Sequence, residues 1–119
     1  MLASLLGCSA EPTVCTASFA MVPLTVLTQG GAPVPGLTIS ATTLRTGQSF
    51  GVPQPLGGSQ PGAYVVFDDG LRDRIRASGD SVRITGSGGA AGFTANFIFD
   101  VPGGCHVRKV AGPDTITVQ

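Results

Sequence analysis

The sequence predicts an all-β fold, a β-sandwich of seven or eight short strands. Glycine (18) and proline (9) together make up more than a fifth of the 119 residues, and charged residues make up only 12%, about half the share in an average soluble domain. Short apolar runs alternate with clusters of turn-forming residues, and none shows the 3.6-residue period of a confident helix. This combination is typical of short strands joined by tight turns.

Length and charge indicate how the chain is organised. A chain of 119 residues can bury one hydrophobic core but not two, so residues 15–119 are predicted to form a single sandwich domain behind a short leading segment, 1–14. Seven basic and seven acidic residues cancel, which leaves no electrostatic footprint for binding nucleic acid. The mean hydropathy is +0.33, but no run approaches the roughly 18 consecutive apolar residues of a membrane-spanning helix. The apolar residues are therefore expected to fill a core.

Two segments carry the clearest strand patterns. Residues 37–44 alternate apolar and polar side chains with a period of two. Residues 93–101 place five apolar side chains on one face and predict a central core strand; these are Phe93, Ala95, Phe97, Phe99 and Val101. Weaker strand signals cover residues 49–52, 63–67, 80–86, 106–110 and 115–118. Seven or eight strands with frequent turns indicate an immunoglobulin-like or prealbumin-like sandwich.

Two further segments have less regular patterns. Residues 19–28 are rich in β-forming side chains, but Pro23 lacks an amide donor. This run suits an edge strand or a strand with a break, and the first strand is predicted at a sheet edge. Residues 71–76 alternate charged and apolar side chains over part of their length. A strand with one solvated face and a short exposed connection both fit that segment.

The N-terminus ends a short apolar run with Leu5-Leu6-Gly7-Cys8. This resembles the end of a bacterial lipoprotein signal, in which the cysteine is acylated. The basic n-region and most of the apolar region of such a signal are absent, which predicts a translation start further upstream. Residues 1–14 are thus interpreted as a signal remnant and tether with lipidation at Cys8. The alternative is an ordinary terminus with an incidental cysteine.

The other two cysteines, Cys15 and Cys105, lie at opposite ends of the predicted domain. If Cys8 is acylated, they form an even pair, and an even pair in an exported domain is usually a disulfide. Three scattered cysteines and one histidine lack the spacing of a zinc site. The sequence therefore predicts a Cys15–Cys105 disulfide and an extracytoplasmic location in a bacterial envelope, either lipid-anchored or periplasmic or secreted.

A turn motif and the strands around it suggest a family. The segment 24–42 leads through Gly31-Ala32-Pro33-Val34-Pro35-Gly36 into an alternating strand, and Gly62-Ala63-Tyr64 begins another. This pattern resembles the carboxypeptidase regulatory-like family of prealbumin-like domains, most closely over residues 19–68. Cys15 and Cys105 also resemble the cysteines that bracket bacterial members. Such domains are usually non-catalytic, so the resemblance implies a binding, folding or spacing role.

Catalysis finds little support in the sequence. The single histidine, His106, excludes a zinc carboxypeptidase site, and any Ser-His-Asp triad would depend on it alone. The competing interpretation is a surface histidine on a strand. The chain ends in Thr115-Ile116-Thr117-Val118-Gln119, without the Tyr-Arg-Gly-Ser tail of prealbumin-like hydroxyisourate hydrolases. We therefore predict no enzymatic activity and no cofactor.

Two clusters of charged residues are candidate binding sites. Asp68, Asp69 and Asp73 are close in sequence and their carboxylates could surround calcium, but the EF-hand spacing is absent and Asp-Asp-Gly is an ordinary turn. No metal site is predicted, and calcium binding by these three carboxylates is the alternative. A second cluster is basic and suits an acidic ligand, although neighbouring aspartates neutralise it; its members are Arg72, Arg74, Arg76 and Arg83.

Two functional hypotheses follow. The first is a lipid-anchored binding or structural module whose partner is an unknown protein or envelope component, and which contacts the membrane only through Cys8. The second is a secreted, unanchored domain that binds a small ligand, either a peptide or a glycan. Tyr64 is the only tyrosine and tryptophan is absent, which disfavours the aromatic platform of a sugar-binding surface.

Overall fold

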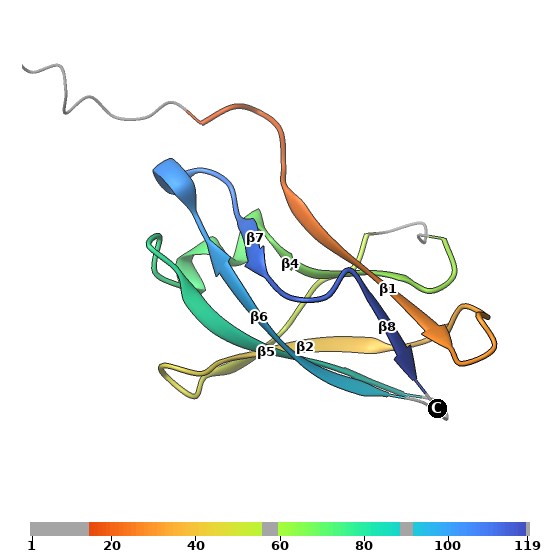
Figure 1. Ribbon diagram of the computed structural model, residues 1–119. Helices are drawn as coiled ribbons and strands as arrows, with labels where there is room; N and C mark the ends of the chain where they lie inside the picture. Colours follow the sequence, from red (N-terminus) through yellow and green to blue (C-terminus); the bar gives the residue numbers. More distant parts are fainter. Residues whose placement is uncertain (1–14, 56–59, 89–91, 119) are drawn as a thin grey trace, which may run out of the picture.

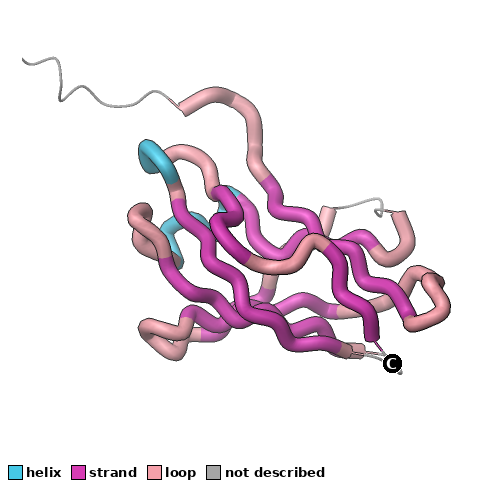
Figure 2. The backbone as a smooth tube through the Cα atoms, in the orientation of Figure 1, coloured by secondary structure: helices cyan, strands magenta, loops and turns pink. Residues whose placement is uncertain are grey.

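The chain forms two β-sheets arranged as two layers, an all-β sandwich-like fold with loops at both ends of the strands (Figures 1 and 2). The computed structural model describes residues 15–55, 60–88 and 92–118. The smaller sheet has the strand order β4-β1-β8, and the larger sheet has the order β3-β2-β5-β6-β7. The strands are β1 (Met21–Thr28), β2 (Thr38–Thr43), β3 (Ser49–Gly51), β4 (Ala63–Asp68), β5 (Asp80–Ser87), β6 (Phe93–Asp100), β7 (Arg108–Ala111) and β8 (Thr115–Val118). Two 3₁₀ helices, η1 (Asp69–Arg74) and η2 (Pro102–Gly104), connect them.

The core forms around the aromatic face of β6, as the alternation in residues 93–101 predicts. Phe97 and Phe99 are 1% and 0% exposed, and β6 pairs with β5 on one side and β7 on the other. The Phe99 ring stacks on Phe67 of β4 with centroids 4.6 Å apart, and the Phe97 ring lies 5.5 Å from that of Phe99. One aromatic stack therefore connects the two sheets, and the prediction of a core strand here is confirmed.

The prediction that β1 is an edge strand is wrong. β1 lies in the middle of its sheet, antiparallel to β4 and parallel to β8. The register with β4 shifts at Pro23, which lies opposite Val65 while Val22 lies opposite Phe67, so that Val66 is an extra residue. A β-bulge is one of the few places inside a sheet that tolerates a residue without an amide donor. Pro23 thus marks the predicted break in the strand rather than an edge.

The glycine- and proline-rich turn before β2 is fastened by a tyrosine from the other sheet. Gly31 and Gly36 have φ of +89° and +75°, which glycine adopts without steric cost. The Tyr64 hydroxyl donates a hydrogen bond to the Val34 carbonyl at 2.5 Å and accepts one from the Leu37 amide at 3.2 Å. One side chain of β4 therefore satisfies two backbone groups of the turn.

Residues 71–76 do not form a strand. They belong to η1 and the residues just after it, and they connect β4 to β5. Of the two interpretations, the short connection is confirmed. It is not exposed throughout, because Leu71 and Ile75 are 8% and 7% exposed and form an inward face. Its far end is fixed by the buried Asp80, which accepts the Arg76 amide at 2.9 Å and pairs with Arg45 at 2.9 Å. The hydrogen bonds from Arg45 are the main reason that the pKa of Asp80 is lowered to about 2.

Candidate functional site

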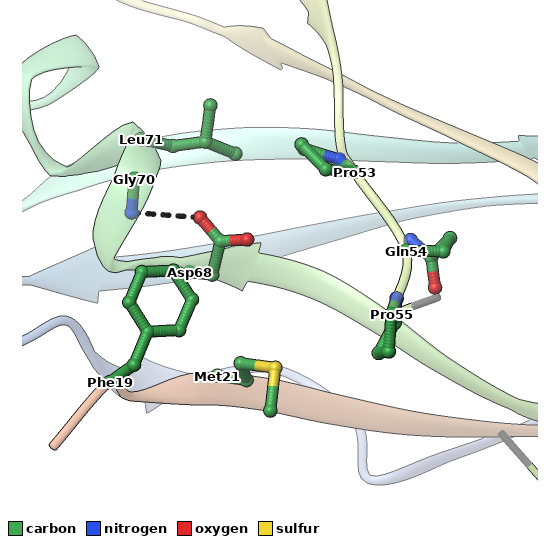
Figure 3. Close-up of a pocket in the computed structure, with 8 residues that line it drawn as sticks. All are labelled: Phe19, Met21, Pro53, Gln54, Pro55, Asp68, Gly70 and Leu71. Atoms are coloured by element: carbon green, nitrogen blue, oxygen red, sulfur yellow. Dashed lines mark hydrogen bonds between the residues drawn. The ribbon is translucent and has the colours of Figure 1, made fainter. Parts of the chain in front are cut away.

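An apolar groove of about 320 Å³ opens where three segments meet beside the start of β1. One wall comes from the N-terminal segment and β1, the second from the connection between β3 and β4, and the third from the end of β4 and η1 (Figure 3). The lining residues are Phe19, Met21, Pro53, Gln54, Pro55, Asp68, Gly70 and Leu71. Concave apolar surfaces with few polar groups are the usual form of a ligand site.

Gln54 holds the second wall against the edge of β4. Its carboxamide accepts a hydrogen bond from the Val65 amide at 2.9 Å and donates one to the Val65 carbonyl at 2.8 Å. It also donates to the Val52 carbonyl at 3.2 Å. The side chain therefore pairs with β4 as the backbone of a strand residue would. This fixes Pro53 and Pro55 beside the groove without another strand.

Phe19 and Met21 form an exposed apolar rim on the first wall. The exposed fractions of the two side chains are 56% and 50%. Ala20, which lies between them, is half-buried. Alternation along β1 sends Val22 and Leu24 into the core and Met21 outward. Single exposed apolar residues are common, whereas a pair bordering a groove is a feature of binding surfaces.

Asp68 lies at the floor of the groove and is 6% exposed. It is the N-cap of η1, and its Oδ1 accepts a hydrogen bond from the Gly70 amide at 2.9 Å, as short polar side chains do at helix starts. Burial raises the pKa of this carboxyl, and the neighbouring charge of Asp69 adds to that effect. The hydrogen bonds at the start of η1 do not fully offset the burial.

The Asp69 side chain does not line the groove, and it joins three segments of the chain. This carboxylate is 4% exposed and accepts three hydrogen bonds, from the Ala20 amide at 2.9 Å, the Val107 amide at 2.7 Å and His106 Nδ1 at 2.5 Å. Burial by itself raises the pKa of Asp69, but these three bonds outweigh it and the pKa is lowered. The carboxylate therefore connects the segment before β1, η1 and the segment before β7.

His106 does not occupy the surface position on a strand that is one of the two interpretations of the sequence. His106 precedes β7 and its side chain is 28% exposed. Its Nδ1 contacts Asp69, and its Nε2 lies 2.8 Å from Thr16 Oγ1, which in turn lies 2.7 Å from Ser18 Oγ. Carboxylate, imidazole and hydroxyl thus follow one another in the order of a hydrolase triad.

The predicted disulfide is present and holds this chain of contacts together. Cys15 and Cys105 are bonded, with their Cα atoms 5.3 Å apart, inside the range that a disulfide requires. Because Thr16 follows Cys15 and His106 follows Cys105, the bond brings the hydroxyl to the imidazole. The residues that line the groove include neither Thr16 nor His106, so this hydroxyl is not part of the groove. The arrangement is best described as a latch, formed by Thr16, Asp69 and His106, that fastens the N-terminal segment to the domain.

The three aspartates whose carboxylates could surround calcium have separate surroundings. Asp68 faces the groove, Asp69 faces His106, and Asp73 is exposed on η1. In residues 15–55, 60–88 and 92–118, no three histidine, cysteine or acidic side chains gather as metal ligands do.

The four arginines are also dispersed. Arg72 donates to the Cys105 carbonyl at 2.9 Å, Arg74 lies 4.8 Å from the centre of the Phe50 ring, and Arg76 pairs with Asp80. Arg83 is exposed on β5. These contacts use three of the four guanidinium groups internally.

Cys8 lies outside the described residues, so the structure does not test the prediction of lipidation at Cys8. Within the part of the chain that the structure describes, no helix has the length and apolar character needed to cross a membrane. Comparison with family models, curated proteins and solved structures finds no match to this chain.

Proposed function

We propose that this chain is a non-catalytic binding or structural module of the bacterial cell envelope, lipid-anchored at Cys8, with a prealbumin-like sandwich of the carboxypeptidase regulatory-like type. The observation that carries the proposal is the apolar groove immediately after the tether, with Phe19 and Met21 exposed on its rim. An anchored domain with such a surface is suited to holding a partner near the membrane. The Cys15–Cys105 disulfide supports an extracytoplasmic location, because structural disulfides persist in oxidising compartments.

The proposed family type draws on the turn that first suggested it. The two glycines of the motif adopt left-handed conformations, and Tyr64 binds the backbone on both sides of Pro35. The residues of the motif therefore depend on one another structurally, as expected if the resemblance over residues 19–68 reflects a shared fold. The alternative function is a secreted, unanchored domain that uses the same groove for a small ligand.

Anchoring is tested by the behaviour of the protein expressed from its native gene. We expect the wild-type protein to enter the detergent phase of a Triton X-114 separation, and Cys8→Ser to move it into the aqueous phase, because two or three acyl chains give stable membrane attachment. Ser9→Ala serves as the matched control and is expected to stay in the detergent phase. Aqueous partitioning of the wild-type protein, unchanged by Cys8→Ser, contradicts the anchor and supports the unanchored alternative.

The non-catalytic proposal is tested at the latch. We expect a fluorophosphonate probe, which labels activated serine and threonine hydroxyls, to leave Thr16 and Ser18 unmodified. His106→Asn is expected to lower the free energy of unfolding by about 1 to 3 kcal/mol, as for the loss of a hydrogen bond to a charged group, with no change in labelling. Labelling of Thr16 that disappears in His106→Asn shows instead that the three side chains act as a hydrolase.

A further inference from the structure

The groove combines apolar walls with one carboxylate on its floor. Of the eight lining residues, Asp68 is the only one that carries a charge. The walls present rings, a thioether and an aliphatic side chain, from Phe19, Met21, Pro53, Pro55 and Leu71. A carboxylate that is 6% exposed and faces such walls is poorly solvated, since apolar groups offer it no hydrogen bonds.

The two oxygens of Asp68 face different surroundings. Oδ1 accepts from the Gly70 amide, whereas the other oxygen points away from Gly70, toward the side of the groove formed by Pro53 and Gln54 (Figure 3). Proline offers no amide donor. The Gln54 amide nitrogen already donates to the Val52 and Val65 carbonyls. The Leu71 amide also stabilises this carboxylate, and the second oxygen keeps acceptor capacity on the side that faces the groove.

We propose that the groove binds a lysine or arginine side chain of a peptide segment on a partner protein, with Asp68 as the counter-charge. The inference rests on the proposed function, because it names the ligand class of the same groove. An aliphatic stem of three or four methylenes can lie along Met21 and Pro53 while its charged end reaches the carboxylate, in the manner of snorkelling side chains.

Two further features agree with a basic side chain. The Phe19 ring lies beside Gly70, since a Cβ built on Gly70 would be 3.9 Å from Phe19 Cζ, so an aromatic ring lies near the carboxylate and can contribute to binding a cation. Burial raises the pKa of Asp68, because it destabilises the ionised carboxylate. A bound cation would stabilise the ionised carboxylate again. A metal ion is a poorer fit, because calcium takes six to eight oxygen ligands and the lining supplies one carboxylate.

The test uses the full chain carrying Cys8→Ser, purified with its disulfide formed and labelled with ¹⁵N. It is titrated with capped pentapeptides of alanine that carry lysine, arginine or norleucine at the centre. We expect the lysine and arginine peptides to shift the amide signals of Gly70 and Leu71 and to bind at least about tenfold more tightly than the norleucine peptide, as for a charge-assisted hydrogen bond. Asp68→Asn is expected to abolish that preference. Asparagine keeps the N-cap of η1, so the helix start stays intact.

Asp73→Asn is the matched control, because it neutralises an exposed carboxylate of the same helix outside the groove; we expect it to keep the preference for basic peptides. Equal effects of Asp68→Asn and Asp73→Asn overturn the inference, since they indicate only the overall charge. Norleucine binding as tight as lysine binding also overturns it, while leaving the groove as the binding surface of the proposed function. A folded protein whose groove amides respond to none of the peptides rejects both the inference and the groove as a binding surface.

Discussion

Truncation of either stacked phenylalanine of β6 is expected to remove a large share of the stability of the domain. Phe97 and Phe99 are almost completely buried, and the Phe99 ring links the two sheets through Phe67. Phe97→Ala and Phe99→Ala should each lower the free energy of unfolding by about 3 to 5 kcal/mol, measured by urea denaturation. A small domain has about 5 to 15 kcal/mol in total.

The strand provides its own control for this measurement. Ile98 lies between the two phenylalanines on the opposite face and is 40% exposed, so Ile98→Ala should change the free energy of unfolding far less than either core substitution. A loss below about 1 kcal/mol for both phenylalanine variants, or an equal loss for Ile98→Ala, contradicts the assignment of the buried face.

Removal of the disulfide is the second change with a large expected effect. The bond joins residues 90 positions apart, and the chain-entropy model gives about 4 to 5 kcal/mol for closing a loop of that length. Cys15→Ala combined with Cys105→Ala should therefore lower the free energy of unfolding by several kcal/mol. Reduction of the wild-type protein with dithiothreitol should produce the same loss, because it opens the loop without changing a residue.

The local consequence of opening the disulfide is specific. Since β1 is central in its sheet, we expect the segment before it to detach while β1 stays paired. Hydrogen exchange should speed up first at the Ala20 and Val107 amides, which both donate to Asp69. Protection that is lost first in the middle of β1 contradicts this order. A double variant that is as stable as the wild type contradicts the predicted loss of unfolding free energy.

The parts of the fold that were predicted from sequence depend on local alternation. The pattern of residues 93–101 specifies which face is buried, because side chains alternate across a strand whatever its partners are. The place of β1 was not predictable in this way. Pro23 requires either an edge or a bulge, and the choice depends on the extra residue Val66 in β4, more than forty positions along the chain.

The groove and the latch differ in how far the sequence indicates them. Nothing in the pattern of residues 19–28 shows that Phe19 and Met21 face Pro53 and Asp68, since that proximity arises from the packing of three distant segments. Part of the latch could have been predicted from the sequence. Once Cys15 and Cys105 are paired, the residues that follow them, Thr16 and His106, must lie close together, and only the carboxylate partner Asp69 remains to be found.

The disulfide also determines how the domain responds to mechanical load. A tether that is pulled from before Cys15, against a load attached after Val118, transmits its tension through the sulfur atoms to Cys105. Only β7, β8 and the turns beside them lie on the taut covalent path between those points. β1 to β6 belong to a closed loop in parallel with that path, and covalent bonds prevent their extension. Under traction only the C-terminal strands can be extended, while the closed loop that contains Phe19 and the rest of the groove carries no tension.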